Sequence, residues 1–414
     1  MTRPIRTLLF STLYPSAARP VHGIFVETRL RELLKTGEVE TRVVAPVPWF
    51  PLTDKRYGEY AQFAATPRTE VRNDIAVEHP RYLLLPKVGM NSAPDWLARG
   101  ALPTVRRLIA SGFDFDLIDA HYYYPDGVAA AIIARAVGKP FVVTARGTDL
   151  NLIPQYPLPR QRILDTARRA AGSIGVCKAL MDTLRELGGE ASKLHVFRNG
   201  VDLVRFHVEP RDVARARLDV SPDRRLLLSV GHLIERKGHH LAIEALMHLP
   251  ADIDLAIIGS GAERDALVAQ ARRAGVADRV RFLGQIPQGD LLWWYNAADI
   301  LLLCSSREGW ANVLLESMAC GTPVVATNIW GTPEVVSTPA AGVLAAARSG
   351  PAMAEGVKSL LAHMPAREAV RAHAEQFSWD QTTEAQLRLF REVIAGRAGT
   401  AVGAETIGAV SPRL

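Results

Sequence analysis

Two acidic residues stand eight positions apart in the stretch REGWANVLLESMACGTPVVAT, residues 307–327. Glu308 follows an apolar run, and Glu316 lies inside the pattern of the next helix. The turn between them, Gly309 to Asn312, leads into that helix, so its backbone N–H groups favour an anion. A carboxylate repels phosphate but accepts hydrogen bonds from hydroxyls. The pair therefore suits a sugar nucleotide, which offers hydroxyls on its sugar and on its ribose.

Two basic residues lie in the loop GHLIERKGHH, which follows the predicted strand RLLLSV. We expect Arg236 and Lys237 to be free to neutralise a diphosphate leaving group, which is the main electrostatic demand of glycosyl transfer. The alternative is that Glu308 caps a helix and Glu316 makes a surface ion pair. That alternative can explain either acid alone. The spacing of the two acids and the basic loop before them favour a sugar-nucleotide site for the pair.

Two glycine-containing turns do not support dinucleotide binding. The stretch IGSGAERDAL has Arg264 where a third glycine would fall, so it fits a tight turn between a strand and a helix. The stretch SAARPVHGIF has only Gly23 before its helix. A single glycine there permits the close approach of a ligand but is no dinucleotide fingerprint, which disfavours hydride transfer.

Short apolar runs alternate with helical patterns along the chain, and the series starts afresh in the second half. IRTLLFS, DLIDAH and PFVVTA belong to the first series, and RLLLSVG, DLAIIGS and DILLLCSS belong to the second. Repeated strand–helix units require a parallel sheet covered on both faces. The 414 residues therefore predict an α/β protein of two doubly wound, Rossmann-like domains. Their boundary falls near residues 198–212, and ligands should bind in the cleft between them.

Two further polar residues of the first half are candidate contacts for an acceptor. His121, in DAHYYYPDG, ends a predicted strand and faces the cleft in this topology. A histidine in an aromatic cluster is also typical of a structural residue. Asp149 can hydrogen-bond an acceptor or cap a helix.

The basic excess of the chain, whose net charge is +6, lies in its first half. Residues 1–205 hold 28 Lys and Arg against 20 Asp and Glu, whereas residues 206–414 hold 21 against 23. Between residues 81 and 108 the basic residues face only Asp95; they are Arg81, Lys87, Arg99, Arg106 and Arg107. This segment suits an anionic membrane surface or a phosphorylated substrate, or is an ordinary solvated helix face. No nucleic-acid motif is recognisable, so nucleic acid is not expected as a partner.

The N-terminal sequence has no signal-peptide pattern, and no apolar run approaches the roughly 18 residues of a membrane span. We therefore expect a cytoplasmic protein that reaches the inner face of the cytoplasmic membrane, if at all, as a peripheral protein.

The block EGWANVLLESMACGTPVVAT resembles the family 4 retaining glycosyltransferases of the GT-B fold. The resemblance extends to RNGVD at 198–202, GHLIERKG at 231–238 and FSWD at 377–380, and it spans the chain to about residue 395. The segment TARGTDLN, residues 144–151, is most similar to the branch that builds bacterial cell-surface and capsular polysaccharides.

The resemblance implies an organisation and roles for matching residues. Residues 1–205 would form the acceptor domain, 206–378 the nucleotide-sugar domain, 379–396 a helix that crosses back to the first domain, and 397–414 a tail without regular structure. Glu308 would bind hydroxyls of the donor sugar, Glu316 the ribose, and Lys237 the phosphates. The sugar and diphosphate would be lined by the backbone of Gly309, Trp310, Ala311 and Asn312, with Gly23 opposite.

Two positions depart from the family pattern. His232 stands where family members usually carry an arginine, so the diphosphate would depend on Lys237 and Arg236. Arg146 stands where many members have a histidine that contacts the donor sugar near the reacting carbon. Arg146 either takes that place or binds an anionic sugar or an acceptor.

The implied reaction moves a sugar, of hexosyl type, from a UDP-, GDP- or ADP-linked donor to a hydroxyl of a glycan or polyprenyl-linked glycan, with retention at the anomeric carbon. No metal and no other cofactor is expected, because Lys237, Arg236 and the helix N-terminus can take the electrostatic role of a metal. Asp114 and Asp116 of FDFD precede a strand and lie away from the predicted cleft. A sugar-nucleotide epimerase and a non-catalytic nucleotide-sugar binding protein remain the rival functions.

Overall fold

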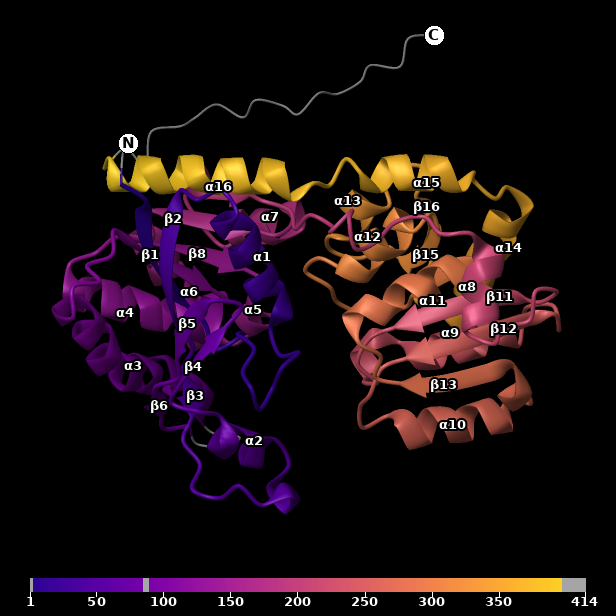
Figure 1. Ribbon diagram of the computed structural model, residues 1–414, viewed down its shortest axis with the longest axis horizontal. Helices are drawn as coiled ribbons and strands as arrows, with labels where there is room; N and C mark the ends of the chain where they lie inside the picture. The colour runs from indigo at the N-terminus through magenta and orange to yellow at the C-terminus, as the bar shows by residue number, and fades with distance from the viewer. Residues whose placement is uncertain (1–2, 85–88, 397–414) are drawn as a thin grey trace, which may run out of the picture.

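Two large sheets, one mostly and one wholly parallel, organise the two halves of the computed structural model, which describes residues 3–84 and 89–396 (Figure 1). The first sheet has the order β10-β9-β8-β7-β1-β2-β5-β4, and its strands are β1 (Ile5–Phe10), β2 (Val39–Val44), β4 (Thr69–Arg72), β5 (Ile75–Glu78), β7 (Leu117–His121), β8 (Phe141–Ala145), β9 (Gly172–Gly175) and β10 (Leu194–Val196). Every neighbouring pair is parallel except β4 and β5.

The second sheet is parallel throughout and has the order β13-β12-β11-β14-β15-β16. Its strands are β11 (Arg225–Val230), β12 (Ile253–Ile258), β13 (Val280–Gly284), β14 (Ile300–Leu303), β15 (Val324–Thr327) and β16 (Gly342–Ala345). The strands β14 and β15 are buried along their whole length, because helices cover both faces of the sheet. The predicted α/β class with two Rossmann-like halves is confirmed.

Helices surround each sheet. Those of the first lobe are α1 (Ile24–Leu34), α2 (Glu59–Ala65), α3 (Ala93–Ala110), α4 (Val128–Val137), α5 (Thr148–Asn151), α6 (Pro157–Arg169) and α7 (Lys178–Glu186). Those of the second are α8 (Arg211–Arg217), α9 (His239–Leu246), α10 (Arg264–Arg273), α11 (Leu291–Ala297), α12 (Asn312–Ala319), α13 (Thr332–Val335), α14 (Gly350–Ala362) and α15 (Arg367–Ala374). Within the described residues, no helix is long and apolar enough to cross a bilayer.

The last helix, α16 (Trp379–Ile394), begins beside the second lobe and packs on the first (Figure 1). Its residues Leu387, Phe390 and Val393 share an apolar cluster with Leu117 of β7 and Val142 of β8. Burial of these side chains holds the end of the chain on the first lobe. The predicted tail, 397–414, lies outside the described residues.

A small excursion between β2 and α3 enlarges the first lobe. It contains α2, the β4–β5 pair, and a second sheet of two strands, β3 (Val47–Pro48) and β6 (Arg81–Tyr82). In Figure 1, α2 lies at the end of the lobe farthest from α16. The sequence did not predict these short strands.

Candidate active site

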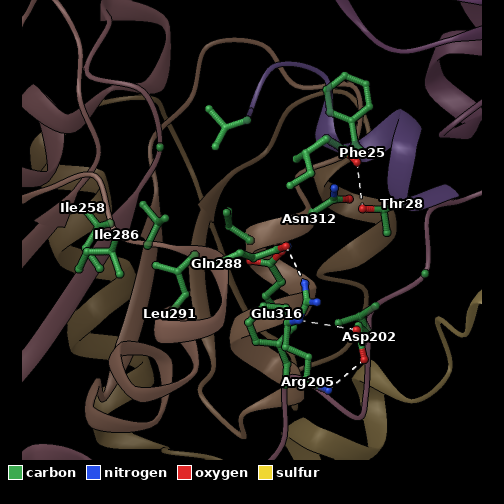
Figure 2. A pocket seen from close by; sticks show the side chains of 18 of the residues that line it. Phe25, Thr28, Asp202, Arg205, Ile258, Ile286, Gln288, Leu291, Asn312 and Glu316 are labelled. Atoms are coloured by element: carbon green, nitrogen blue, oxygen red, sulfur yellow. Dashed lines mark hydrogen bonds and ion pairs between the residues drawn. The ribbon is translucent and has the colours of Figure 1, made fainter. Parts of the chain in front are cut away.

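A cleft of about 370 Å³ opens between the two lobes, at the carboxyl ends of the second sheet's strands. Phe25 and Thr28 of α1 form its first-lobe wall, opposite Asn312 at the start of α12 (Figure 2). Open parallel sheets bind ligands at this edge, because the loops that follow the strands converge there.

One end of the cleft is apolar. Ile258 ends β12, Ile286 follows β13, and Leu291 begins α11; their side chains gather on one side of the cavity (Figure 2). Val230, which ends β11, extends this surface. A flat, uncharged group such as a nucleobase fits such a wall. These residues were not predicted from the sequence, although Val230 and Ile258 are the last residues of predicted strands.

Glu316, on α12, projects into the cleft and is held at both carboxylate oxygens. The hydroxyl of Tyr295 donates to Oε2 at 2.7 Å. Nε2 of Gln288, which lies beside Glu316 in Figure 2, donates to Oε1 at 3.3 Å. Nη1 of Arg205 donates to Oε1 of Gln288 at 2.7 Å, which fixes that amide in turn. Burial raises the pKa of Glu316 above its ordinary value, and the two hydrogen bonds oppose that shift. Glu316 is therefore a fixed acceptor on the cleft wall.

Glu308 lies beside the cleft in a compact group of polar side chains. Nζ of Lys237 is 2.6 Å from its Oε1, and Oγ of Ser305 donates to the same oxygen at 2.7 Å. Nη1 of Arg236 lies 3.7 Å from Oε2 and donates to the carbonyl of Arg307 at 2.8 Å. The expectation that these two cations are free was wrong, because Glu308 folds back between them.

The side chain of Lys237 also connects this group to the cleft. Its methylene groups pass about 3.5 Å from the position that a Cβ on Gly231 would take, and Gly231 lines the cleft. His232, the next residue, is exposed and lines the cleft too. The described lining includes neither Glu308 nor Lys237, and Lys237 adjoins the wall through Gly231.

The turn between the two acids contacts the first lobe closely. A Cβ on Gly309 would lie 2.0 Å from the carbonyl oxygen of Arg146, so only glycine fits there. Trp310 is buried and packs against Phe377 with ring centroids 5.8 Å apart, and Ala311 is also buried. Of the four turn residues expected to line the sugar, only Asn312 is among the described lining of the cleft.

Arg146, which follows β8, contacts three side chains of the surrounding structure. Its Nη2 donates to Nδ1 of His121 at 2.5 Å, and its Nη1 donates to Oδ1 of Asn199 at 3.3 Å. Its guanidinium carbon lies 5.4 Å from the ring centre of Phe25. Nδ2 of Asn199 continues the chain by donating to Oδ1 of Asn312 at 3.2 Å. Burial lowers the pKa of Arg146 to about 9.

His121, which was expected to face the cleft, is 1% exposed, is not among the described lining residues, and contacts Arg146. Its Nε2 lies 3.3 Å from Oδ2 of Asp119, while its Nδ1 accepts from the arginine. Burial lowers its pKa to about 4, so the imidazole is neutral at physiological pH.

Asp149 is fully buried, and its carboxylate accepts hydrogen bonds from backbone N–H groups. It accepts from the N–H groups of Tyr123 and Gly147, both at 2.7 Å, and of Arg146 at 3.1 Å. Asp149 lies inside α5, whose N-cap is Gly147 without a side-chain cap hydrogen bond, so it is not the N-cap of that helix. Its carboxylate instead fixes the loop that carries Arg146.

Gly23 caps α1 with φ of 67°, in the left-handed region. A Cβ there would lie 2.3 Å from the backbone of Leu13, so the close approach of two first-lobe segments already requires glycine. Val21 and Ile24 beside it line the cleft.

The basic segment has more partners than its sequence suggested. Arg107 pairs with Glu78, and Asp95 pairs with Arg162 at 2.6 Å. Arg99 lies over the ring of Trp96 at 5.2 Å and is exposed, as is Arg106. Lys87 lies outside the described residues. Arg107 therefore has an acidic partner from β5, outside the segment, that the count within residues 81–108 does not include.

Among residues 3–84 and 89–396, no group of three or more His, Cys, Asp or Glu side chains is arranged to hold a metal ion. Asp114, of the FDFD stretch, pairs with Lys139 at 2.6 Å. The polar groups in and beside the cleft are suited to hydrogen-bond hydroxyls and to neutralise phosphate.

Two family models cover most of the chain. Residues 30–205 match the model described as Glycosyltransferase Family 4, and residues 210–377 match the model described as Glycosyl transferases group 1. A Bacillus subtilis protein named for teichuronic acid biosynthesis, the glycosyltransferase TuaC, is 30% identical over 336 residues, which are 79% of this chain and 82% of that protein. D-inositol 3-phosphate glycosyltransferase 1 of Catenulispora acidiphila is 28% identical over 96% of this chain and 98% of its own.

Solved structures share the fold. Sucrose-phosphate synthase of Thermosynechococcus elongatus superposes with a TM-score of 0.77 at 20% identity and covers 95% of this chain and 100% of its own. Anabaena HepE in complex with UDP has a TM-score of 0.71 at 21% identity, and the match covers 94% of this chain and 100% of HepE. Together with the two-lobed architecture and the sequence matches, these similarities show that the chain belongs to the GT-B glycosyltransferases of the group 1 and family 4 type.

Proposed function

We propose that this glycosyltransferase moves a sugar from a nucleotide-sugar onto a hydroxyl of a glycan or polyprenyl-linked glycan, with retention at the anomeric carbon. The observation that carries the proposal is the placement of Glu316 in the cleft, together with the Glu308–Lys237 pair that adjoins its wall at Gly231. HepE, which shares the fold, has been solved with UDP and with UDP-glucose, and this supports a nucleotide-sugar donor.

In this proposal the donor lies along the cleft. The base packs on Ile258, Ile286 and Leu291, and the ribose hydroxyls donate to Glu316. The diphosphate lies at the start of α12, where the helix dipole and backbone N–H groups favour negative charge. Lys237 then turns from Glu308 to a phosphate oxygen, and the released carboxylate accepts hydrogen bonds from the donor sugar.

Arg146 is the first-lobe group proposed to contact the sugar near the reacting carbon. His121, held neutral by burial, positions the guanidinium by accepting one of its N–H groups. Asp149 positions the same residue through the backbone. These two residues, expected to contact an acceptor, are proposed to act by positioning Arg146, because their polar atoms already have partners within the lobe.

The bond between the anomeric carbon and the phosphate oxygen breaks, and the acceptor oxygen bonds to that carbon on the same face. The proton of the acceptor hydroxyl passes to the departing phosphate. Lys237, Arg236 and the start of α12 stabilise the charge that develops on the diphosphate. We propose that this positive charge makes a divalent metal dispensable.

The acceptor is proposed to be a membrane-bound glycan reached from the cytoplasm. The name of TuaC, which refers to teichuronic acid biosynthesis, supports a cell-surface polysaccharide. The excess of basic residues in residues 1–205 supports a peripheral approach to an anionic bilayer.

Nucleotide release from UDP-, GDP- and ADP-sugars, measured with and without an acceptor panel, tests the proposal. Release that depends on an acceptor supports transfer. Interconversion of the donor sugar without an acceptor would indicate an epimerase, and binding without turnover would indicate a nucleotide-sugar binding protein.

A further inference from the structure

A second cavity, of about 180 Å³, lies wholly within the first lobe. It opens where the parallel strands β1, β2 and β5 end, since Thr12, Ala45 and His79 follow those strands and line it. None of its lining residues is shared with the interlobe cleft. Its volume is about half that of the cleft, which suits a single small ring better than a nucleotide.

One turn of the chain separates this cavity from the cleft. His22 lines the cavity, whereas Val21 and Ile24 on either side of it line the cleft. Nε2 of His22 lies 3.1 Å from the carbonyl oxygen of Thr12, which only accepts, so this nitrogen carries the hydrogen. A ligand in the cavity would therefore lie one chain segment away from the donor.

The polar wall of the cavity places opposite charges side by side. Nη2 of Arg19 donates to Oε1 of Glu59 at 2.7 Å and to Nδ1 of His22 at 3.0 Å. The guanidinium carbon lies 4.8 Å from the ring centre of Phe63. The side chain of Glu59 is 61% exposed, so its carboxylate can exchange partners at little cost.

These charges discriminate between two kinds of sugar. The carboxylate of Glu59 would repel the phosphate of a phosphorylated sugar. The same carboxylate already neutralises the positive charge of Arg19. A neutral sugar instead donates hydroxyls to the carboxylate and accepts from the guanidinium. Its C–H face can pack on apolar side chains of the lining, such as Val47, Pro48 and Phe63.

We propose that this cavity binds a neutral monosaccharide unit of the acceptor, with Arg19 and Glu59 hydrogen-bonding its hydroxyls beside Phe63. The proposal rests on the function proposed above, because the bound unit would belong to the acceptor glycan, of which another unit reaches the donor in the cleft. It distinguishes this chain from a transferase that recognises its acceptor by a phosphate group.

Saturation-transfer NMR on the full chain tests the proposal with a panel of neutral methyl hexopyranosides and the matching hexose phosphates. At least one neutral glycoside should bind the wild type more tightly than its phosphate. Glu59→Gln and Arg19→Gln should each weaken that binding about 10-fold, the loss expected for one charge-assisted hydrogen bond. Arg56→Gln is the matched control, since Arg56 is exposed nearby and does not line the cavity.

Preferential binding of phosphates, no binding of any neutral glycoside, or equal binding by wild type and both cavity variants would overturn the proposal. Thermal stabilisation by UDP, GDP and ADP is measured in parallel and should be the same in all four proteins. Nucleotide binding without glycoside binding refutes the cavity proposal alone. Glycoside binding without any nucleotide binding refutes the proposed function and leaves the cavity as a sugar site.

Discussion

Lys237 and Glu308 form an ion pair, with Nζ 2.6 Å from Oε1 and side chains only 16% and 8% exposed. Because the pair is shielded from water, its attraction is stronger than that of a surface pair. A phosphate oxygen that enters the site must compete with Glu308 for the lysine. The pair thus links donor binding to the release of a carboxylate that can bind the donor sugar.

Lys237→Ala should lower turnover by about two orders of magnitude or more, because it removes a cation directed at the leaving diphosphate. Initial rates with saturating nucleotide-sugar give the comparison. His232→Arg, in the same loop, is the comparison variant and should be tolerated or raise turnover, since it adds positive charge. Full activity of Lys237→Ala, or a rate abolished by EDTA and restored by Mg²⁺, would contradict the metal-free account.

Substitutions of Glu316 and Glu308 should differ in their effect on the affinity for free nucleotide. Glu316→Gln weakens a charge-assisted hydrogen bond to the ribose, which is worth roughly 1.5–3 kcal/mol or about 10- to 100-fold in affinity. Glu308→Gln should leave the affinity for free nucleotide unchanged and lower only turnover. Calorimetric titration with UDP, GDP and ADP measures this. Equal losses of nucleotide affinity in both variants would show that the roles are assigned to the wrong acids.

The crossing helix should contribute stability through one buried amide. Oε1 of Gln386 accepts from Nε of Arg29 at 2.9 Å, and its Nε2 donates to Oδ2 of Asp119 at 3.0 Å. Gln386→Ala leaves Nε of Arg29 without a partner and Oδ2 of Asp119 with only His121, and a buried unpaired group costs roughly 1–3 kcal/mol. Urea unfolding should show this loss, whereas the exposed control Arg388→Ala should change stability by less than about 0.5 kcal/mol. A Gln386→Ala variant as stable as the control would refute the proposed contribution of Gln386 to stability.

The sequence predicted the fold better than the contacts within the site. Runs such as LLLSV identify β11, because strands buried on both faces need continuous apolar sequence. Strand β4, Thr69–Arg72, alternates exposed and half-buried residues and has no such run, and β10 has only three residues. Their pairing is decided by neighbouring strands, which a local pattern does not contain.

The same limit applies to the site. The spacing of Glu308 and Glu316 indicated carboxylates around a helix start, and α12 does begin at Asn312 between them. That Lys237 pairs with Glu308 depends on β11 and β14 lying side by side, which brings distant loops together. That Tyr295 holds Glu316 likewise depends on the packing of α11 against α12.

The support of Arg146 by His121 should give stability a specific pH dependence. The pKa of His121 falls from an ordinary 6.5 to about 4 in the folded chain, first because of burial, with Asp119 opposing and Arg146 adding to the shift. Between these values only the unfolded chain takes the proton, so this residue lowers stability as pH falls from 6.5 toward 4. The destabilisation caused by His121→Gln should therefore be about 2 kcal/mol smaller at pH 5 than at pH 7.5. A loss that is equal at both pH values would contradict a neutral, buried His121.

Binding to anionic liposomes should depend on the basic surface of the first lobe. Each Lys or Arg near such a surface contributes about 1 kcal/mol and is screened over roughly 8 Å at physiological salt. Wild type should co-sediment at low salt and dissociate as salt rises. Reversal of Arg99, Arg106 and Arg107 to Glu should abolish co-sedimentation and leave nucleotide binding intact. A wild type that ignores anionic lipid at low salt would favour a soluble acceptor.

The most direct test of the central claim is NMR of the reaction with a nucleotide-sugar labelled with ¹³C at the anomeric carbon. The account predicts that a neutral glycoside acceptor produces a new glycosidic signal with the donor's anomeric configuration and one nucleoside diphosphate per bond formed. It also predicts that Lys237→Ala produces neither at a comparable rate. A product of inverted configuration, or conversion of the donor sugar without a new glycosidic bond, would contradict it.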